Sequence, residues 1–149
     1  MSKELEDAIN NALKGSMREN ALSFSAFLRE NGIPLYSNGD GRGWAIGGVV
    51  GNSGGYMMVD DSGGNLGIWI NDCDFKDAGT ASEGLKEFAW AHVVNCPQEP
   101  CVNGGCAEKN HRNVVFGREY ESTCHSSLAV LNPDAETLEN AKMLFLMLK

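Results

Sequence analysis

Glycine is concentrated in one part of the chain, and this concentration limits the fold more than any other feature. Residues 39–67 contain eleven of the 18 glycines. Short runs typical of β-strands lie between them, at 44–50, 56–60 and 66–71. The sequence has no P-loop, and no G-x-G-x-x-G motif opens a helix, so we assign these glycines to turns rather than to phosphate binding. The spacing predicts a three-stranded antiparallel meander over residues 43–71.

The N-terminal segment, residues 1–32, has a helical pattern. Apolar residues recur at four-residue spacing over its first part, which places Leu5, Ile9 and Leu13 on one face. Gly15 is expected to break or bend the helix. Asn31 and the glycine after it form a C-terminal signal, because glycine tolerates the left-handed conformation.

The second half of the chain alternates helices and strands. A capping box over residues 80–83 predicts a helix over 80–95, and a cysteine-rich loop follows at 96–106. Two strands are expected within 113–131, at 113–122 and 127–131. Asn132 has the form of an N-cap for a last helix over 133–148. Together these segments predict one α+β domain over residues 1–149, with an antiparallel sheet of about five strands and with N-terminal, middle and C-terminal helices.

Charge and apolar runs exclude some partners and point to a compartment. The net charge is −8, from 12 basic and 20 acidic residues, and no basic run follows a phosphate backbone, so nucleic acid is not an expected partner. The apolar run at 143–148 is too short to span a bilayer, so we expect no membrane association. The acidic N-terminus lacks the pattern of a signal peptide. We therefore expect a cytoplasmic protein with reduced thiols.

Four of the five cysteines lie between positions 96 and 124, with the spacing C-x4-C-x4-C-x17-C. Thiolates are preferred zinc ligands, and four of them form a closed tetrahedral site. Prolines stiffen the first half of the loop, and a glycine pair lets the second half fold back. The sequence therefore predicts one structural zinc per chain, held by Cys96, Cys101, Cys106 and Cys124.

Other readings of the cluster stay open. His92 lies one helical turn before the loop and is a substitute ligand if Cys124 does not bind, although its place on an apolar stripe is more typical of a core histidine. His111 and His125 are weaker substitutes. The thiols could also be unligated, or they could form disulfides or a redox site, although a C-x-x-C motif at a helix start is missing.

The part of the chain from about residue 90 to the end resembles a group of uncharacterised bacterial proteins, mostly from Firmicutes. The resemblance rests on the cysteine-rich loop, the strand Phe116-Gly-Arg-Glu-Tyr120, the cysteine after it and the helix start Asn132-Pro-Asp-Ala-Glu136. It covers roughly the last two-fifths of the chain. It implies that the four cysteines act as a unit, and it implies no activity.

The last helix carries Met143 and Met147 on the side opposite to its expected inner face. Either this helix is wedged within one core, or its methionines form a surface for a ligand or for a homodimer. We therefore expect a non-enzymatic zinc-stabilised domain that binds a small molecule or a protein, through a sheet face or through this helix. A metal-free thiol redox sensor and a metal-dependent enzyme with an open zinc position are the alternatives.

Overall fold

The computed structural model describes residues 3–48, 54–71, 75, 78–95 and 111–148, with backbone alone for 78, 94–95, 111–113 and 121–127. Within these ranges the chain forms helices and an antiparallel sheet, so the predicted α+β class is confirmed. The helices are α1 (Lys3–Ala12), α2 (Gly15–Glu30), α3 (Glu83–Ala91) and α4 (Ala135–Met147), with a short 3₁₀ turn η1 (Ala78–Thr80). The strands are β1 (Leu35–Ser37), β2 (Gly43–Ile46), β3 (Gly55–Asp60), β4 (Asn65–Ile70), β5 (Val93–Asn95), β6 (His111–Val115) and β7 (Arg118–Leu131).

The sheet is built on the predicted glycine-rich meander. Strands β2, β3 and β4 pair in sequence order, β1 extends the sheet on one side, and β7 pairs with β4 on the other. These five strands form the expected antiparallel sheet, and the short strands β5 and β6 also pair with β7. Side chains alternate between the two faces of each strand, so Met57, Val59 and Ile68 are buried on one face.

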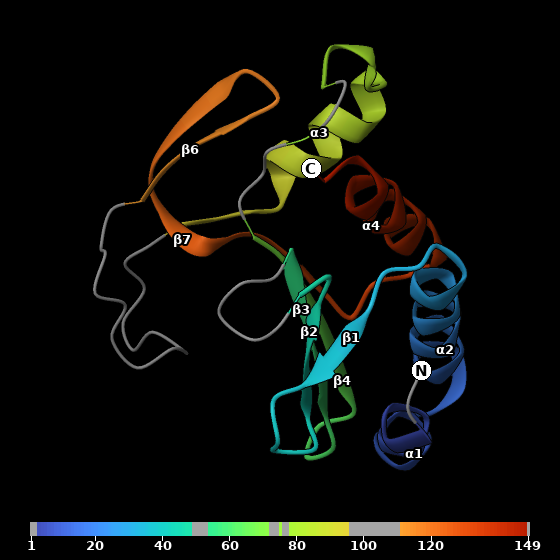
Figure 1. Cartoon of the computed structure of the whole chain (residues 1–149). Coiled ribbons are helices and arrows are strands. Elements are labelled where there is room, and N and C mark those ends of the chain that lie inside the picture. Colours follow the sequence, from blue (N-terminus) through green and yellow to red (C-terminus); the bar gives the residue numbers. More distant parts are fainter. Residues whose placement is uncertain (1–2, 49–53, 72–74, 76–77, 96–110, 149) are drawn as a thin grey trace.

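The described helices cover one face of the sheet, which we call the inner face (Figure 1). Helices α1 and α2 contact β3 and β4, and α2 also contacts α4. The Phe145 ring of α4 packs 5.6 Å from the ring of Phe24, centroid to centroid, and lies directly over the backbone at Gly55. The core therefore lies between the inner face and these helices. Among the described residues, no helix has both the length and the apolar character that crossing a membrane requires.

The N-terminal helices follow the sequence prediction closely. The helical segment divides between α1 and α2, and Gly15 has a φ of +58° at the break. Leu5, Ile9 and Leu13 are fully buried, as their spacing predicts. Helix α2 ends at Glu30 with Asn31 as its C-cap, and Gly32 after it has a φ of +68°.

The middle and last helices begin later than predicted. The N-cap of α3 is Ser82, whose hydroxyl accepts from the Leu85 N–H at 3.2 Å, so the expected capping box at residues 80–83 is wrong. Helix α3 also ends at Ala91, and the residues predicted as its last turn form β5. The N-cap of α4 is Asp134, which accepts from the Thr137 N–H at 2.8 Å. Asn132, the predicted cap, has a different role.

The two strands predicted within 113–131 are also arranged differently. Phe116 and Gly117 have φ values of +45° and +81°, and positive φ at two successive residues gives a tight hairpin turn. The first predicted strand is therefore a hairpin of β6 and the start of β7. The second is the end of β7, which runs without interruption through residues 118–131. The Phe116 ring stacks on Phe75 at 4.8 Å, so tertiary packing accompanies its unusual backbone.

Candidate functional site

Three of the four predicted zinc ligands, Cys96, Cys101 and Cys106, lie outside the described residues. The backbone of Cys124 lies in β7, and its side chain is also outside the description. Among the described residues, no group of three or more His, Cys, Asp or Glu side chains is arranged to hold a metal ion. The zinc site therefore stays a prediction.

The described backbone does fix where the cysteine loop leaves the sheet and where it returns. Asn95, directly before Cys96, pairs with Thr123 of β7. His111, which opens β6, pairs with the same Thr123. One residue of β7 can have these two partners only if they lie on its opposite sides. Neighbouring strands are about 4.8 Å apart, so Asn95 and His111 are about 10 Å apart and flank the residue next to Cys124.

The predicted substitute ligand, His92, lies at the C-terminal end of α3. Its Nδ1 is 2.7 Å from the carbonyl oxygen of Phe88, and its ring centroid is 4.3 Å from that of the Phe88 ring. The residue is half-buried. One ring nitrogen and one face of the His92 ring are thus engaged by Phe88 of the same helix, but the residue is not part of the buried core. The side chains of His111 and His125 are outside the description.

The face of the sheet opposite to the helices has an unusual composition. We call it the outer sheet face, and it is formed by the outward positions of β1, β2, β3, β4 and β7. Cross-strand pairing aligns these residues in two rows, Tyr36-Ala45-Tyr56-Trp69-Ala129 and Gly43-Met58-Gly67-Leu131. Antiparallel sheets with one free face normally present polar residues there. In this sheet the outward positions of both rows are aromatic, aliphatic or glycine, the polar pair Asp60 and Asn65 follows them at one end, and Leu131 is 66% exposed.

The glycines of the second row hold the aromatic rings of the first row against the sheet. A Cβ atom at Gly67 would lie 2.5 Å from Cζ3 of Trp69, so the indole occupies the space that a side chain would take. In the same way, the Tyr56 ring lies over Gly43, and its hydroxyl is hydrogen-bonded to Asn38. The two ring centroids are 6.3 Å apart. Burial, and to a smaller extent the charge of Asp40, raises the pKa of Tyr56.

A cleft of about 350 Å³ lies at one end of the outer sheet face. Its apolar part includes Met58, Trp69 and Leu131, and its polar part includes Asp60 and two asparagines. The Asn132 amide donates to Asn65 Oδ1 at 3.0 Å, and its own oxygen accepts from the Leu66 N–H at 2.9 Å.

The carboxylate at this cleft is held by its own turn and by the amide chain. Asp60 accepts from the Ser62 hydroxyl at 2.8 Å and from the Ser62 N–H at 3.0 Å. These bonds, together with one from the Asn65 side chain, lower the pKa of Asp60. Asp60, Asn65 and Asn132 thus form a connected row of ordered polar groups beside the Trp69 ring.

A second groove lies between α4 and the start of α3. Its volume is about 390 Å³, and it is lined by Leu85, Met143, Leu146 and Met147 together with smaller and polar residues. Met143 is 49% exposed and Leu146 is 43% exposed. The prediction that Met143 faces away from the core is therefore confirmed, whereas Met147 is half-buried along the groove.

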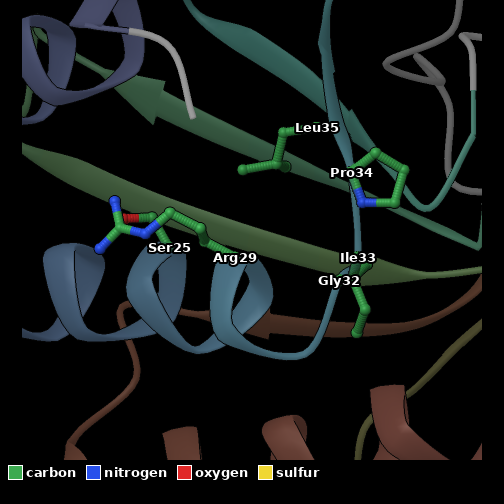
Figure 2. A pocket seen from close by; sticks show the side chains of 6 residues that line it. All are labelled: Ser25, Arg29, Gly32, Ile33, Pro34 and Leu35. Carbon is green, nitrogen blue, oxygen red and sulfur yellow. The ribbon is translucent and has the colours of Figure 1, made fainter.

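A third cleft, of about 290 Å³, lies where the chain passes from α2 to β1 (Figure 2). Arg29 is the charged residue that lines it, and this guanidinium is 3.9 Å from a carboxylate oxygen of Glu6. The Ser25 hydroxyl donates to the Leu22 carbonyl oxygen at 3.0 Å. The polar groups of this cleft are thus engaged in local contacts of the helices, and they do not form a nucleophile–base pair.

The carboxyl groups with lowered pKa elsewhere in the described chain have local causes. Backbone N–H groups of Arg42 and Gly43 lower the pKa of Asp40 in the turn after β1. The Thr137 N–H lowers the pKa of Asp134 at the start of α4. The turn explains the lowered pKa of Asp40, and the helix cap explains that of Asp134.

Sequence reasoning identified a sheet face as one contact surface but did not name the residues on it. The alternation of Tyr56, Met58 and Asp60 against buried neighbours was the available signal. Pairing across five strands was needed to align Trp69 and Leu131 with them. A comparison with protein families, curated proteins and solved structures finds no match to this chain.

Proposed function

We propose that this chain is a non-enzymatic, zinc-stabilised domain that binds a small molecule or a protein partner through its outer sheet face. The observation that carries the proposal is the composition of this face. Apolar and aromatic residues occupy outward positions on five adjacent strands, and no described helix covers them. Tyr36 and Leu131 are exposed and Trp69 is half-buried on this face, and exposed apolar surface of this kind marks interaction sites in folded proteins.

The composition of the cleft favours binding of a specific ligand over non-specific hydrophobic association. Ligand sites combine an apolar lining with a few oriented polar groups. Here Trp69 supplies a flat ring, and Asn132 and Asp60 supply polar atoms whose positions are fixed by hydrogen bonds. A ligand would therefore bind in the cleft in one preferred orientation.

The zinc part of the proposal rests on the four clustered cysteines and on the topology around Thr123. Asn95 and His111, the described residues on either side of the segment 96–110, flank this residue, one position before Cys124 in the chain. A zinc with four protein ligands has no open position, so it would stabilise the fold without hydrolytic chemistry. A reducing cytoplasm, which we propose as the location, would keep the thiols available.

Metal content tests this part directly. Untagged protein is purified in reductant without added metal, and zinc is measured by mass spectrometry together with reactive thiols before and after chelation. We expect one zinc per chain and about four thiols newly exposed by chelation. Metal-free protein with freely reactive thiols would rule out the site and favour the redox alternative.

A fragment screen tests the contact surface. Small aromatic and polar fragments are screened by ligand-observed NMR against the wild type, Trp69→Ala and Met143→Ala. We expect hits that Trp69→Ala loses and Met143→Ala keeps, because Met143 lies on α4, outside the outer sheet face. Hits that are lost only in Met143→Ala would move the binding site to the α4 groove.

We also propose a homodimer formed through α4. The exposed side chains of Met143 and Leu146 favour it, since they add apolar surface along a groove. Methionine adapts well to irregular apolar partners. This contact would leave the outer sheet face free for its ligand.

A further inference from the structure

We infer that the cleft on the outer sheet face binds a neutral saccharide, with one sugar ring stacked on the Trp69 indole and its hydroxyls bonded to the row Asp60-Asn65-Asn132. The inference deepens the proposed function, because it names the class of ligand for the same surface. It rests on three properties of the cleft, namely its flat aromatic wall, its oriented amides and its charge.

The aromatic wall is flat because Gly67 has no side chain. The Trp69 ring occupies the position of the missing Cβ and therefore lies along the sheet. The residue is half-buried, as expected when one side of a ring packs on backbone and another is accessible. The π-face of an aromatic ring carries negative charge density, and it attracts the weakly positive C–H groups on one side of a pyranose. Met58 and Leu131 extend the apolar surface on either side of the ring.

The polar row supplies the donors and acceptors that sugar hydroxyls need. Each hydroxyl is both a donor and an acceptor, and adjacent hydroxyl pairs fit amide and carboxylate groups. The Asn132 amide donates one hydrogen to Asn65, and its second hydrogen has no acceptor among the described residues. Its position is fixed by Leu66, whose N–H donates to the side chain and whose carbonyl accepts from the Asn132 N–H at 2.7 Å.

The negative charge of the cleft and of the whole chain favours a neutral saccharide over an anionic ligand. The described residues that line the cleft include Asp60 and no lysine or arginine, and the whole chain carries a net charge of −8. The nearby Arg42 acts on the charge of Asp60, but its guanidinium is 3.4 Å from the Asp61 carboxylate and does not line the cleft. A phosphate or a nucleic acid would therefore be repelled. A neutral polyol would not.

The environment of Asp60 also favours a neutral ligand over a cationic one. Its carboxylate already accepts hydrogen bonds from the hydroxyl and the N–H of Ser62. These bonds occupy acceptor positions of the carboxylate, and the nearby charge of Arg42 offsets its negative charge, so less of both remains for a lysine or arginine side chain of a ligand. The cleft volume of about 350 Å³ lies within the range of small-ligand sites.

The test uses the whole chain and four neutral tetrasaccharides, built from glucose, mannose, galactose or N-acetylglucosamine. Binding is measured by saturation-transfer NMR and calorimetry, with tetralysine as the cationic competitor. We expect at least one saccharide to bind with a Kd on the order of 1 mM or tighter. Trp69→Ala and Asn132→Gly should each weaken it at least about tenfold, which corresponds to about 1.4 kcal/mol.

Two further variants test whether binding depends on the position of the Trp69 ring or only on a folded protein. Gly67→Ala keeps Trp69 but forces its ring off the backbone, so it should weaken saccharide binding as Trp69→Ala does. Val114→Ala should leave binding unchanged, because the exposed Val114 side chain lies on β6 and does not line the cleft. Circular dichroism and melting curves establish that each variant is folded.

The outcomes distinguish this inference from the proposed function. Fragments that bind at Trp69 while no tetrasaccharide binds at about 10 mM would overturn the saccharide and keep the binding surface. If tetralysine binds the wild type and this binding is lost in Trp69→Ala, the saccharide inference is wrong and the site binds a cationic ligand. If neither fragments nor saccharides bind, both the inference and the proposed contact surface fail.

Discussion

Substitution of Asn132 should destabilise the sheet, because this residue joins two of its strands. As an N-cap it would stabilise only α4. In the structure it connects the end of β7 to the start of β4, through one backbone bond and two side-chain bonds, to Leu66 N–H and to Asn65 Oδ1. Its φ is +48°, in the left-handed region. Asn132 therefore stabilises the sheet, and substitutions can separate its two contributions.

The magnitudes follow from these contacts. Each side-chain hydrogen bond contributes about 1 kcal/mol net, so removing both should lower the free energy of unfolding by about 2 kcal/mol. Alanine at a positive φ adds about 1–2 kcal/mol of strain, whereas glycine adds none. We expect Asn132→Ala to cost about 3–4 kcal/mol and Asn132→Gly about 2 kcal/mol. Asn132→Asp keeps the acceptor for Leu66 and should cost about 1 kcal/mol.

Urea unfolding followed by circular dichroism measures these differences from the transition midpoint and its slope. The slope should be the same for all variants. The reasoning is refuted if Asn132→Ala and Asn132→Gly are equally stable, or if both are within about 0.5 kcal/mol of the wild type. A stable Asn132→Asp together with an unaffected Asp134→Ala would restore Asn132 as the N-cap.

Three other predictions concern the core, the pH dependence and the α4 surface. Phe145→Ala should lower the free energy of unfolding by about 3–5 kcal/mol in urea titrations, because it opens a cavity between α4 and the sheet; a cost below about 1 kcal/mol would contradict this packing. The lowered pKa of Asp40 means that this carboxylate stabilises the fold above its ordinary value of 3.8 and that the contribution is lost as the pH falls further. Melting temperature should therefore fall less steeply below about pH 4 in Asp40→Asn than in the wild type, and parallel curves would exclude the effect. Met143→Glu and Leu146→Glu should each convert the proposed dimer to a monomer in light scattering, and a wild type that is already monomeric would refute that interface.

The meander and the N-terminal helices could be predicted because their signals are local. Glycines mark the turns of the meander, and the period of two places Met57 and Val59 on one face. The spacing of Leu5 and Ile9 places both on the buried side of α1. Local patterns of this kind need no knowledge of distant residues.

The helix starts and the binding cleft could not be predicted, because contacts between distant residues decide them. The sequences before α3 and α4 each offer two capping residues that lie two positions apart. The structure uses Ser82 and Asp134, and Asn132 is instead held by Leu66, which lies 66 positions away in the sequence. In the same way, Trp69 and Leu131 meet only because β4 pairs with β7.

The backbone around Thr123 gives a physical reason why a structural metal site would stabilise this part of the sheet. Register shifts lie on both sides of it, between Val93 and Asn95 and between His111 and residue 113. A register shift interrupts the ladder of hydrogen bonds, so β7 is held less firmly here than along β4. Zinc ligands on the loop and on Cys124 would replace the missing constraint, since they would join both neighbours of β7 at one point. The cleft is built from β3, β4 and the far end of β7, where the ladder is regular. The zinc proposal and the saccharide inference therefore depend on different parts of the sheet, and either can fail without the other.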